Sequence, residues 1–129
     1  ALCVDAACSG NPGPMEYRGV HIPSGKEIFR FGPIQGTNNI GEFLAIVHGL
    51  ALMEQKGIRM PIYSDSVSGQ AWVRNKKAKT TLERNEQTAQ ALDLVARAEN
   101  WLRTHNSSIP ILKWNTEEWG EIPADFGRK

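Results

Sequence analysis

Alternating apolar and polar positions dominate the first quarter of the chain. Residues 1–8, 15–22 ("MEYRGVHI") and 26–31 ("KEIFRF") have the spacing of strands that bury one face. The segment "PSG" at 23–25 has the composition of a tight turn between the second and third of these runs. The pattern therefore predicts three consecutive antiparallel strands.

The hydrophobic spacing changes at Asn39, where an amphipathic helix is predicted as far as Lys56 and is ended by Gly57. Its inner stripe consists of Glu42, Ile46, Gly49, Leu50 and Met53. After this helix, the pattern predicts a strand at 60–66, a short helix that follows Asp65 as far as Val73, and a basic connector at 74–80. A long helix at 85–103, a strand at 108–114 and a tail at 115–129 complete the chain.

The first long helix lies between two predicted strands, and a connection of this length joins parallel strands with a right-handed crossover. The strand at 60–66 is therefore expected beside residues 1–8. The predicted fold class is α/β, with a five-stranded mixed sheet of three antiparallel strands followed by two parallel ones. Helices flank this sheet, and the tail lacks a long C-terminal helix. With 129 residues, the chain has the size of one domain spanning 1–129.

Charge and cysteine content narrow the classes of function. The chain has 15 Lys and Arg against 14 Asp and Glu, so no global field attracts polyanions and nucleic-acid binding would need a local cluster. Cys3 and Cys8 point to opposite faces of one predicted strand, which argues against a disulfide and favours a cytoplasmic location. No apolar run approaches the roughly 18 residues of a membrane span, so we expect no membrane partner. We also expect the protein to be a monomer.

Carboxylates stand at positions that do not suit a solvated acid. Asp5 lies inside an apolar strand, Glu42 on the inner helical stripe, and Asp65 at the end of a strand. Asp125 lies in a tail flanked by Gly and Pro. Capping offers an alternative for Asp65, and a capping pair with Asn39 offers one for Glu42. For Asp125 the alternative is a surface acid.

The predicted crossover brings Asp5, Asp65 and the first turn of the Glu42 helix to one end of the sheet. Carboxylates that are close together repel each other unless a cation neutralises them. Oxygen ligands with open positions suit Mg²⁺ or Mn²⁺ better than zinc. Because the three His residues share no ligand spacing, the hypothesis is an all-carboxylate site for a hard divalent cation.

The chain resembles type 1 ribonuclease H in the segments "DAACSGNPGP", "TNNIGE", "YSDS" and "ADFG", and this resemblance spans essentially the whole sequence. It implies a ribonuclease H-like fold and an endonuclease that cuts the RNA strand of RNA/DNA hybrids, leaving 5′-phosphate and 3′-hydroxyl ends. It also implies two Mg²⁺ ions, with Mn²⁺ as a possible substitute. The implied catalytic and metal-binding residues are Asp5, Glu42, Asp65 and Asp125, with Asp5 as the bridging ligand.

The resemblance also implies residues that contact the hybrid. Asn11, Asn38 and Asn39 are similar to family residues in the minor groove, where 2′-hydroxyls are displayed. Thr37 and Asn85 resemble parts of a pocket for a DNA phosphate. The basic connector and its neighbour could follow the DNA backbone through Trp72, Arg74, Lys76, Lys77 and Lys79. The alternatives are turn formation for Asn11, helix capping for Asn38 or Asn39, and a solvated connector for the basic residues.

One departure from the family concerns a His that many members carry on a loop after the last strand. No His lies between Lys113 and Asp125, and Glu117, Glu118 or Glu121 could take its place. Two other functions stay open. One is a catalytically silent nucleic-acid-binding domain, against which the presence of all four acids weighs. The other is a related nuclease that acts on DNA.

Overall fold

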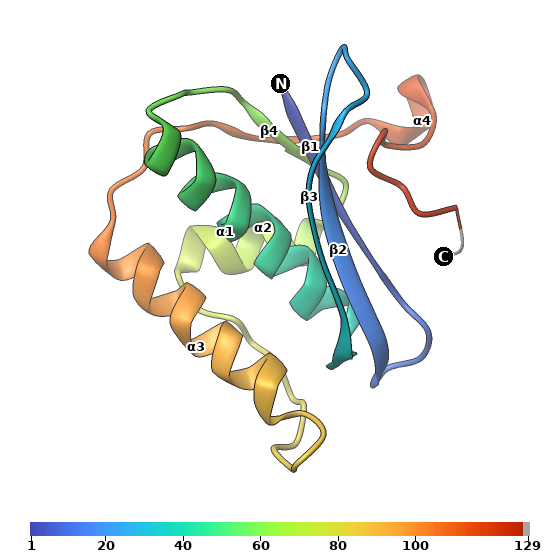
Figure 1. Ribbon diagram of the computed structural model, residues 1–129, viewed down its shortest axis with the longest axis vertical. Coiled ribbons are helices and arrows are strands. Elements are labelled where there is room, and N and C mark those ends of the chain that lie inside the picture. Colours follow the sequence, from blue (N-terminus) through green and yellow to red (C-terminus); the bar gives the residue numbers. More distant parts are fainter. Residues whose placement is uncertain (128–129) are drawn as a thin grey trace.

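Figure 1 shows a computed structural model, which describes residues 1–127. The elements are β1 (Leu2–Cys8), β2 (Gly13–His21), β3 (Glu27–Gly36), α1 (Asn38–Lys56), β4 (Ile62–Ser64), α2 (Val67–Asn75), α3 (Ala89–Thr104), β5 (Ile111–Lys113) and α4 (Thr116–Trp119). The strands form one sheet in the order β3-β2-β1-β4-β5. β1 pairs antiparallel with β2 and parallel with β4. The predicted mixed sheet is confirmed.

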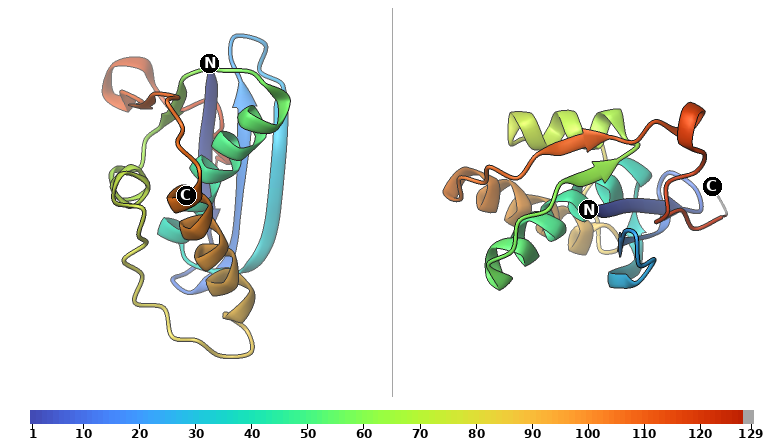
Figure 2. Two further views of the ribbon diagram at one scale, coloured as in Figure 1. Left: turned by 90° about the vertical axis from the view of Figure 1, so that its left-hand side faces the viewer. Right: turned by 90° about the horizontal axis from the view of Figure 1, so that it is seen from above.

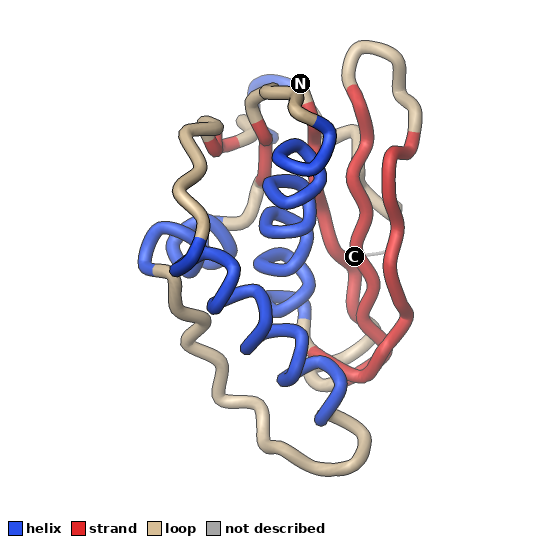
Figure 3. The backbone as a smooth tube through the Cα atoms, turned by 60° about the vertical axis from the view of Figure 1, so that its left-hand side comes forward, coloured by secondary structure: helices blue, strands red, loops and turns tan. Residues whose placement is uncertain are grey.

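The helices α1 and α3 lie on one side of the sheet, and the C-terminal tail lies on the other (Figures 1 and 3). On the helical side, Val4 and Ala6 of β1 belong to the main core together with Phe43 and Ile46 of α1. On the opposite side, a second cluster is formed by Cys3, Val20, Ile122 and Ala124. Alternate residues of β1 thus pack into two apolar layers, one on each side of the sheet. Cys3 and Cys8 are both free thiols.

The third strand is longer than predicted, because it continues past residue 31 to Gly36. Gly32 has a φ of +106°, and a Cβ there would lie 2.6 Å from the carbonyl oxygen of Met15. The pairing of β2 and β3 shifts register between Met15 and Tyr17, which accommodates the Gly-Pro pair at an edge strand. The Gly-Pro pair therefore marks an irregularity within the strand, whereas the sequence pattern had suggested its end.

The second long helix starts later than predicted, at Ala89 instead of residue 85. The Asn85 side chain accepts hydrogen bonds from the backbone N–H groups of Gln87 and Thr88, and Thr88 Oγ1 accepts one from the Asn85 N–H. These side chains replace the helical hydrogen bonds of the first turn. Within residues 1–127, no helix is long and apolar enough to cross a membrane.

Candidate active site

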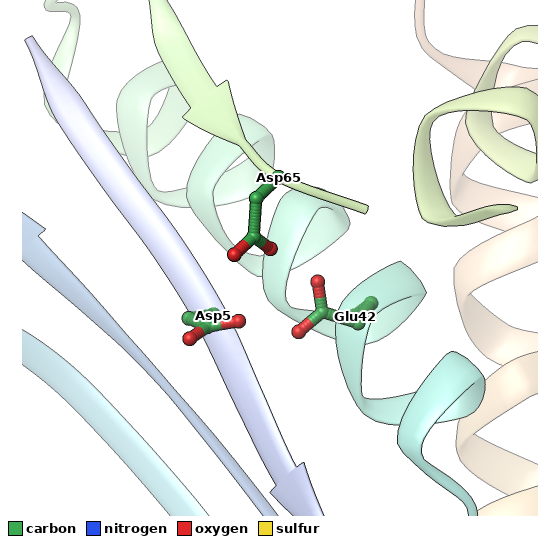
Figure 4. A group of neighbouring side chains, drawn as sticks. All are labelled: Asp5, Glu42 and Asp65. Carbon is green, nitrogen blue, oxygen red and sulfur yellow. The ribbon is translucent and has the colours of Figure 1, made fainter. Parts of the chain in front are cut away.

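Asp5, Glu42 and Asp65 converge from three elements (Figure 4). One carboxylate oxygen of each lies within 4.8 Å of the other two. Asp5 comes from β1, Glu42 from the first turns of α1, and Asp65 from the residue after β4. Asp5 is 0% exposed and Glu42 is 2% exposed, whereas Asp65 is half-buried. The predicted convergence of these acids at one end of the sheet is therefore present.

Glu42 is held against β1, because its Oε1 accepts a hydrogen bond of 2.6 Å from the Ala6 backbone N–H. Capping does not explain Glu42, since the N-cap of α1 is Thr37, whose Oγ1 accepts from the Ile40 N–H. The helix also starts at Asn38, one residue earlier than predicted. This hydrogen bond thus links the start of α1 to Ala6, the residue that follows Asp5 in β1.

Asp65 is not a helix cap either, because the N-cap of α2 is Ser66, whose Oγ accepts from the Gly69 N–H at 2.9 Å. The Asp65 backbone carbonyl accepts from Lys113 Nζ at 2.9 Å. A Cβ on Gly69 would lie 3.1 Å from Glu42 Cβ, so a glycine there permits the close approach of α2 to α1. These contacts leave the Asp65 carboxylate directed at the acidic group (Figure 4).

Among the residues that the structure describes, Asp125 is not a member of this three-residue group. Its Oδ2 accepts from the Gly127 N–H at 2.9 Å, and its backbone carbonyl accepts from Arg18 Nη2 at 2.6 Å. Its predicted role as a fourth ligand stays a prediction. Arg18, which contacts the tail, was not identified by the sequence pattern because no periodic signal links residues so far apart.

The donor set of the three-residue group is chemically uniform, because every ligand atom is a carboxylate oxygen. Carboxylates gathered this closely repel one another, and a cation among them offsets that repulsion. Oxygen-only ligands are those that Mg²⁺ and Mn²⁺ prefer. The residues present therefore fit a hard divalent cation.

A groove of about 700 Å³ collects seven of the ten residues predicted to contact the hybrid. Its walls include Asn11, Thr37, Asn38, Asn39, Trp72 and Asn85. Asn11 Oδ1 accepts from the Asn38 N–H at 3.1 Å and so ties the turn after β1 to the start of α1. Trp72 is mostly buried and packs edge-on against Phe43, so only part of it is available to the groove. The segment 79–83 and Thr88 also line the groove; of these, the sequence analysis had named only Lys79.

Lys76 and Lys77 do not line this groove. They open the connector between α2 and α3, an irregular segment that runs to the start of α3 (Figure 2). Lys76 ends α2 with a φ of +55°, and the Lys77 N–H donates to the Trp72 carbonyl. Ala78 is buried, and its N–H donates to Glu99 Oε2 at 2.8 Å. The connector is thus anchored to both flanking helices while the two lysine side chains stay exposed.

The loop after β5 has its own arrangement. Asn115 is the N-cap of α4, and its side chain exchanges hydrogen bonds with the backbone and side chain of Glu118. Glu117, Glu118 and Glu121 do not join the acidic group in the described part of the chain. Nothing therefore places these acids where the family His would act.

Together the sheet order and the all-carboxylate group define an α/β domain with a site suited to divalent cations. The model of the RNase H family matches residues 1–113, and the chain belongs to the ribonuclease H family. This confirms the resemblance of the chain to ribonuclease H and the expectation of an enzyme of this family, and three of the four sequence segments lie within the matched residues.

Relatives and solved structures agree with this assignment. The chain is 32% identical over 145 residues to a ribonuclease H of Neorickettsia sennetsu, covering 99% of this chain and 89% of that protein. It is 32% identical over 150 residues to a ribonuclease H of Trichodesmium erythraeum, covering 98% and 93%. The fold is similar to LC11-RNase H1 from compost (18% identity, 91% and 84% covered, TM-score 0.55). It is also similar to RNase H1 of Halobacterium salinarum (20% identity, 91% and 86% covered, TM-score 0.53).

Proposed function

We propose that this protein is a metal-dependent endonuclease that hydrolyses the RNA strand of RNA/DNA hybrids, giving 5′-phosphate and 3′-hydroxyl ends. The observation that carries the proposal is the meeting of Asp5, Glu42 and Asp65 within 4.8 Å. Such a group is costly to bury without a cation, and family membership supplies the reaction class.

Asp5, Glu42 and Asp65 would hold the divalent ions, with Asp125 as the fourth ligand. Two bound Mg²⁺ or Mn²⁺ ions would lower the pKa of an attacking water and stabilise the charge of the leaving 3′-oxygen. The chain itself contributes rigidity: β1 fixes Asp5, and the 2.6 Å hydrogen bond from Ala6 fixes Glu42. Carboxylates held in this way need little reorganisation when the substrate arrives.

The groove beside the start of α1 supports the choice of substrate. Asn11, Asn38 and Asn39 would contact 2′-hydroxyls in the minor groove of the hybrid. Thr37 and Asn85 would bind a DNA phosphate, which the N-terminus of α1 also attracts. Trp72, Lys76 and Lys77 would follow the DNA backbone by stacking and charge. A cytoplasmic, monomeric enzyme remains the expectation.

One assay tests the proposal. End-labelled hybrid, duplex RNA and duplex DNA are each incubated with wild-type protein, with an Asp65→Asn variant and with a Glu54→Gln variant, in Mg²⁺ or in EDTA. Glu54 is an exposed acid of α1 and serves as the matched control. We expect wild type and Glu54→Gln to cut the RNA strand of the hybrid, and to do so only in Mg²⁺. No other combination of protein, substrate and metal condition should show cutting.

The remaining outcomes separate the alternatives. Hybrid binding by wild-type protein without cutting in Mg²⁺ or Mn²⁺ would identify a silent binding domain. Cutting of duplex DNA would identify a related DNA nuclease. Undiminished cutting by Asp65→Asn would remove the acidic group from the mechanism.

A further inference from the structure

The C-terminal tail reaches the face of the sheet opposite to α1 without a long helix to hold it (Figure 1). Two side chains fasten it: Ile122 is 1% exposed and Ala124 is 0% exposed. Both belong to one apolar cluster with Cys3 of β1 and Val20 of β2. This apolar contact fixes the tail as far as the residue just before Asp125.

Beyond Ala124, the tail is held by the guanidinium of Arg18. Arg18 Nε donates to the Ala124 carbonyl at 2.8 Å, and Nη2 donates to the Asp125 carbonyl at 2.6 Å. Arg18 Cζ lies 4.9 Å from the centroid of the Phe126 ring. One side chain therefore contacts three consecutive residues of the tail.

Arg18 stands at a defined place relative to the acidic group. In the antiparallel pairing of β1 with β2, Arg18 is the direct partner of Asp5. Directly paired residues project from the same face of a sheet. Arg18 thus fixes the main chain of Asp125 from the strand position next to Asp5.

We propose that Arg18 is a positioning residue that holds Asp125 in place for the acidic site formed by Asp5, Glu42 and Asp65. This inference rests on the proposed function, in which Asp125 is the fourth ligand. In this role Arg18 acts through the backbone carbonyls of Ala124 and Asp125. Arg18 bonds the backbone carbonyl of Asp125 and leaves its carboxylate, whose Oδ2 accepts from the Gly127 N–H at 2.9 Å, to face other groups.

The chemistry of arginine suits this role. The planar guanidinium presents two parallel N–H groups that match two successive carbonyls, while its face stacks on an aromatic ring. Arg30 lies over the same Phe126 ring, with its Cζ 5.1 Å from the centroid, and its Nε donates to Glu16 Oε1 at 3.2 Å. Arg30 is therefore a matched control that shares the ring contact and lacks the two carbonyl contacts.

The kinetic test compares Arg18→Ala, Arg18→Lys and Arg30→Ala on the hybrid in Mg²⁺. Arg18→Ala should lower kcat by about tenfold or more with KM within about threefold, because the substrate groove is not touched. Arg18→Lys keeps the charge but not the planar pair of donors, so most of the loss should remain. Arg30→Ala should stay within about threefold of wild type.

A double-mutant cycle with Asp125→Asn asks whether Arg18 acts through Asp125. If it does, adding Arg18→Ala to Asp125→Asn should change kcat by less than about twofold. An equal loss in both backgrounds would overturn the proposal, as would wild-type activity in Arg18→Ala. Full activity of Arg18→Lys, or a loss in Arg30→Ala equal to that in Arg18→Ala, would overturn the assignment to the two carbonyl contacts.

Two measurements without substrate separate this inference from the proposed function. Amide hydrogen exchange of residues 120–127 should accelerate about tenfold in Arg18→Ala and change little in Arg30→Ala. The dissociation constant for Mn²⁺, measured by calorimetry, should rise about threefold or more in Arg18→Ala. Unchanged exchange and Mn²⁺ affinity would overturn the role of Arg18. A wild-type protein that cuts no hybrid would instead overturn the proposed function.

Discussion

Glu42 and Ala6 are joined by a 2.6 Å hydrogen bond, in which the Ala6 backbone N–H donates to Glu42 Oε1. Both residues are buried, and Ala6 follows Asp5 directly in β1. The bond therefore ties Glu42 to the strand position next to Asp5, and it also satisfies a backbone donor in the interior. One carboxylate serves both the fold and the proposed chemistry.

The two roles of Glu42 should separate in Glu42→Gln. The amide oxygen of Gln can still accept from Ala6, so the free energy of unfolding in urea should stay within about 1 kcal/mol of wild type. The lost charge should weaken Mn²⁺ binding by about tenfold or more and abolish cutting of the hybrid. Glu42→Ala leaves the Ala6 N–H unsatisfied and should cost about 1–3 kcal/mol more than Glu42→Gln. Equal destabilisation by Gln and Ala would show that the hydrogen bond is not the structural link.

Mg²⁺ should stabilise the folded protein, because ions that bind only the native state raise its free energy of unfolding, by about 2.7 kcal/mol at a concentration 100 times the dissociation constant. We expect Tm to rise with MgCl₂ beyond any rise in NaCl of matched ionic strength. Asp5→Asn removes one of the three clustered carboxylates and should abolish the Mg²⁺-specific rise. A rise of the same size in Asp5→Asn would place the stabilising ion elsewhere.

The sequence pattern predicted the sheet order and the convergence of Asp5, Glu42 and Asp65, because both follow from hydrophobic periodicity and crossover handedness. It missed the late start of α3, since Asn85 and Thr88 replace helical hydrogen bonds with side-chain ones. That competition is decided by local geometry, which residue spacing does not encode.

The attachment of the tail was equally hidden from the sequence. Arg18 and Asp125 are 107 residues apart, and an arginine in an alternating strand is an ordinary surface residue by pattern alone. Capping, the alternative to a metal-binding role for Glu42 and Asp65, does not apply, because the hydroxyl residues Thr37 and Ser66 cap the two helices. Hydroxyl side chains compete well with carboxylates at an N-cap.

Glu99 should control how the basic connector binds the hybrid, because its carboxylate accepts the Ala78 N–H between Lys77 and Lys79. Glu99→Ala should loosen the connector and weaken hybrid binding in EDTA by about threefold to tenfold. Glu99→Gln keeps an acceptor and should bind within about twofold of wild type. Fluorescence anisotropy with a labelled hybrid measures both. Equal loss in the two variants would point to the charge of Glu99 rather than to its hydrogen bond.

The stability of the protein should fall as the pH falls below about 6.5, in part through His48. His48 stacks on Phe29 with ring centroids 4.1 Å apart, and its Nδ1 shares a hydrogen bond of 2.9 Å with the Tyr17 hydroxyl. Burial lowers the pKa of His48 from the value of 6.5. Burial also raises the pKa of Tyr17 to about 12, so this hydroxyl stays neutral over the same range.

The sign follows from proton uptake. Between the lowered pKa of folded His48 and 6.5, the unfolded chain binds more protons than the folded one, so the free energy of unfolding rises with pH. The contribution of His48 to the free energy of unfolding is fully present above pH 6.5 and is lost as the pH falls through the pKa of His48 in the folded protein. Urea unfolding at about pH 7.5 and about pH 5.5 should show a smaller difference in His48→Phe than in wild type. His21→Gln, at the partly exposed end of β2, is the control. A pH dependence unchanged in His48→Phe would assign the effect to other groups.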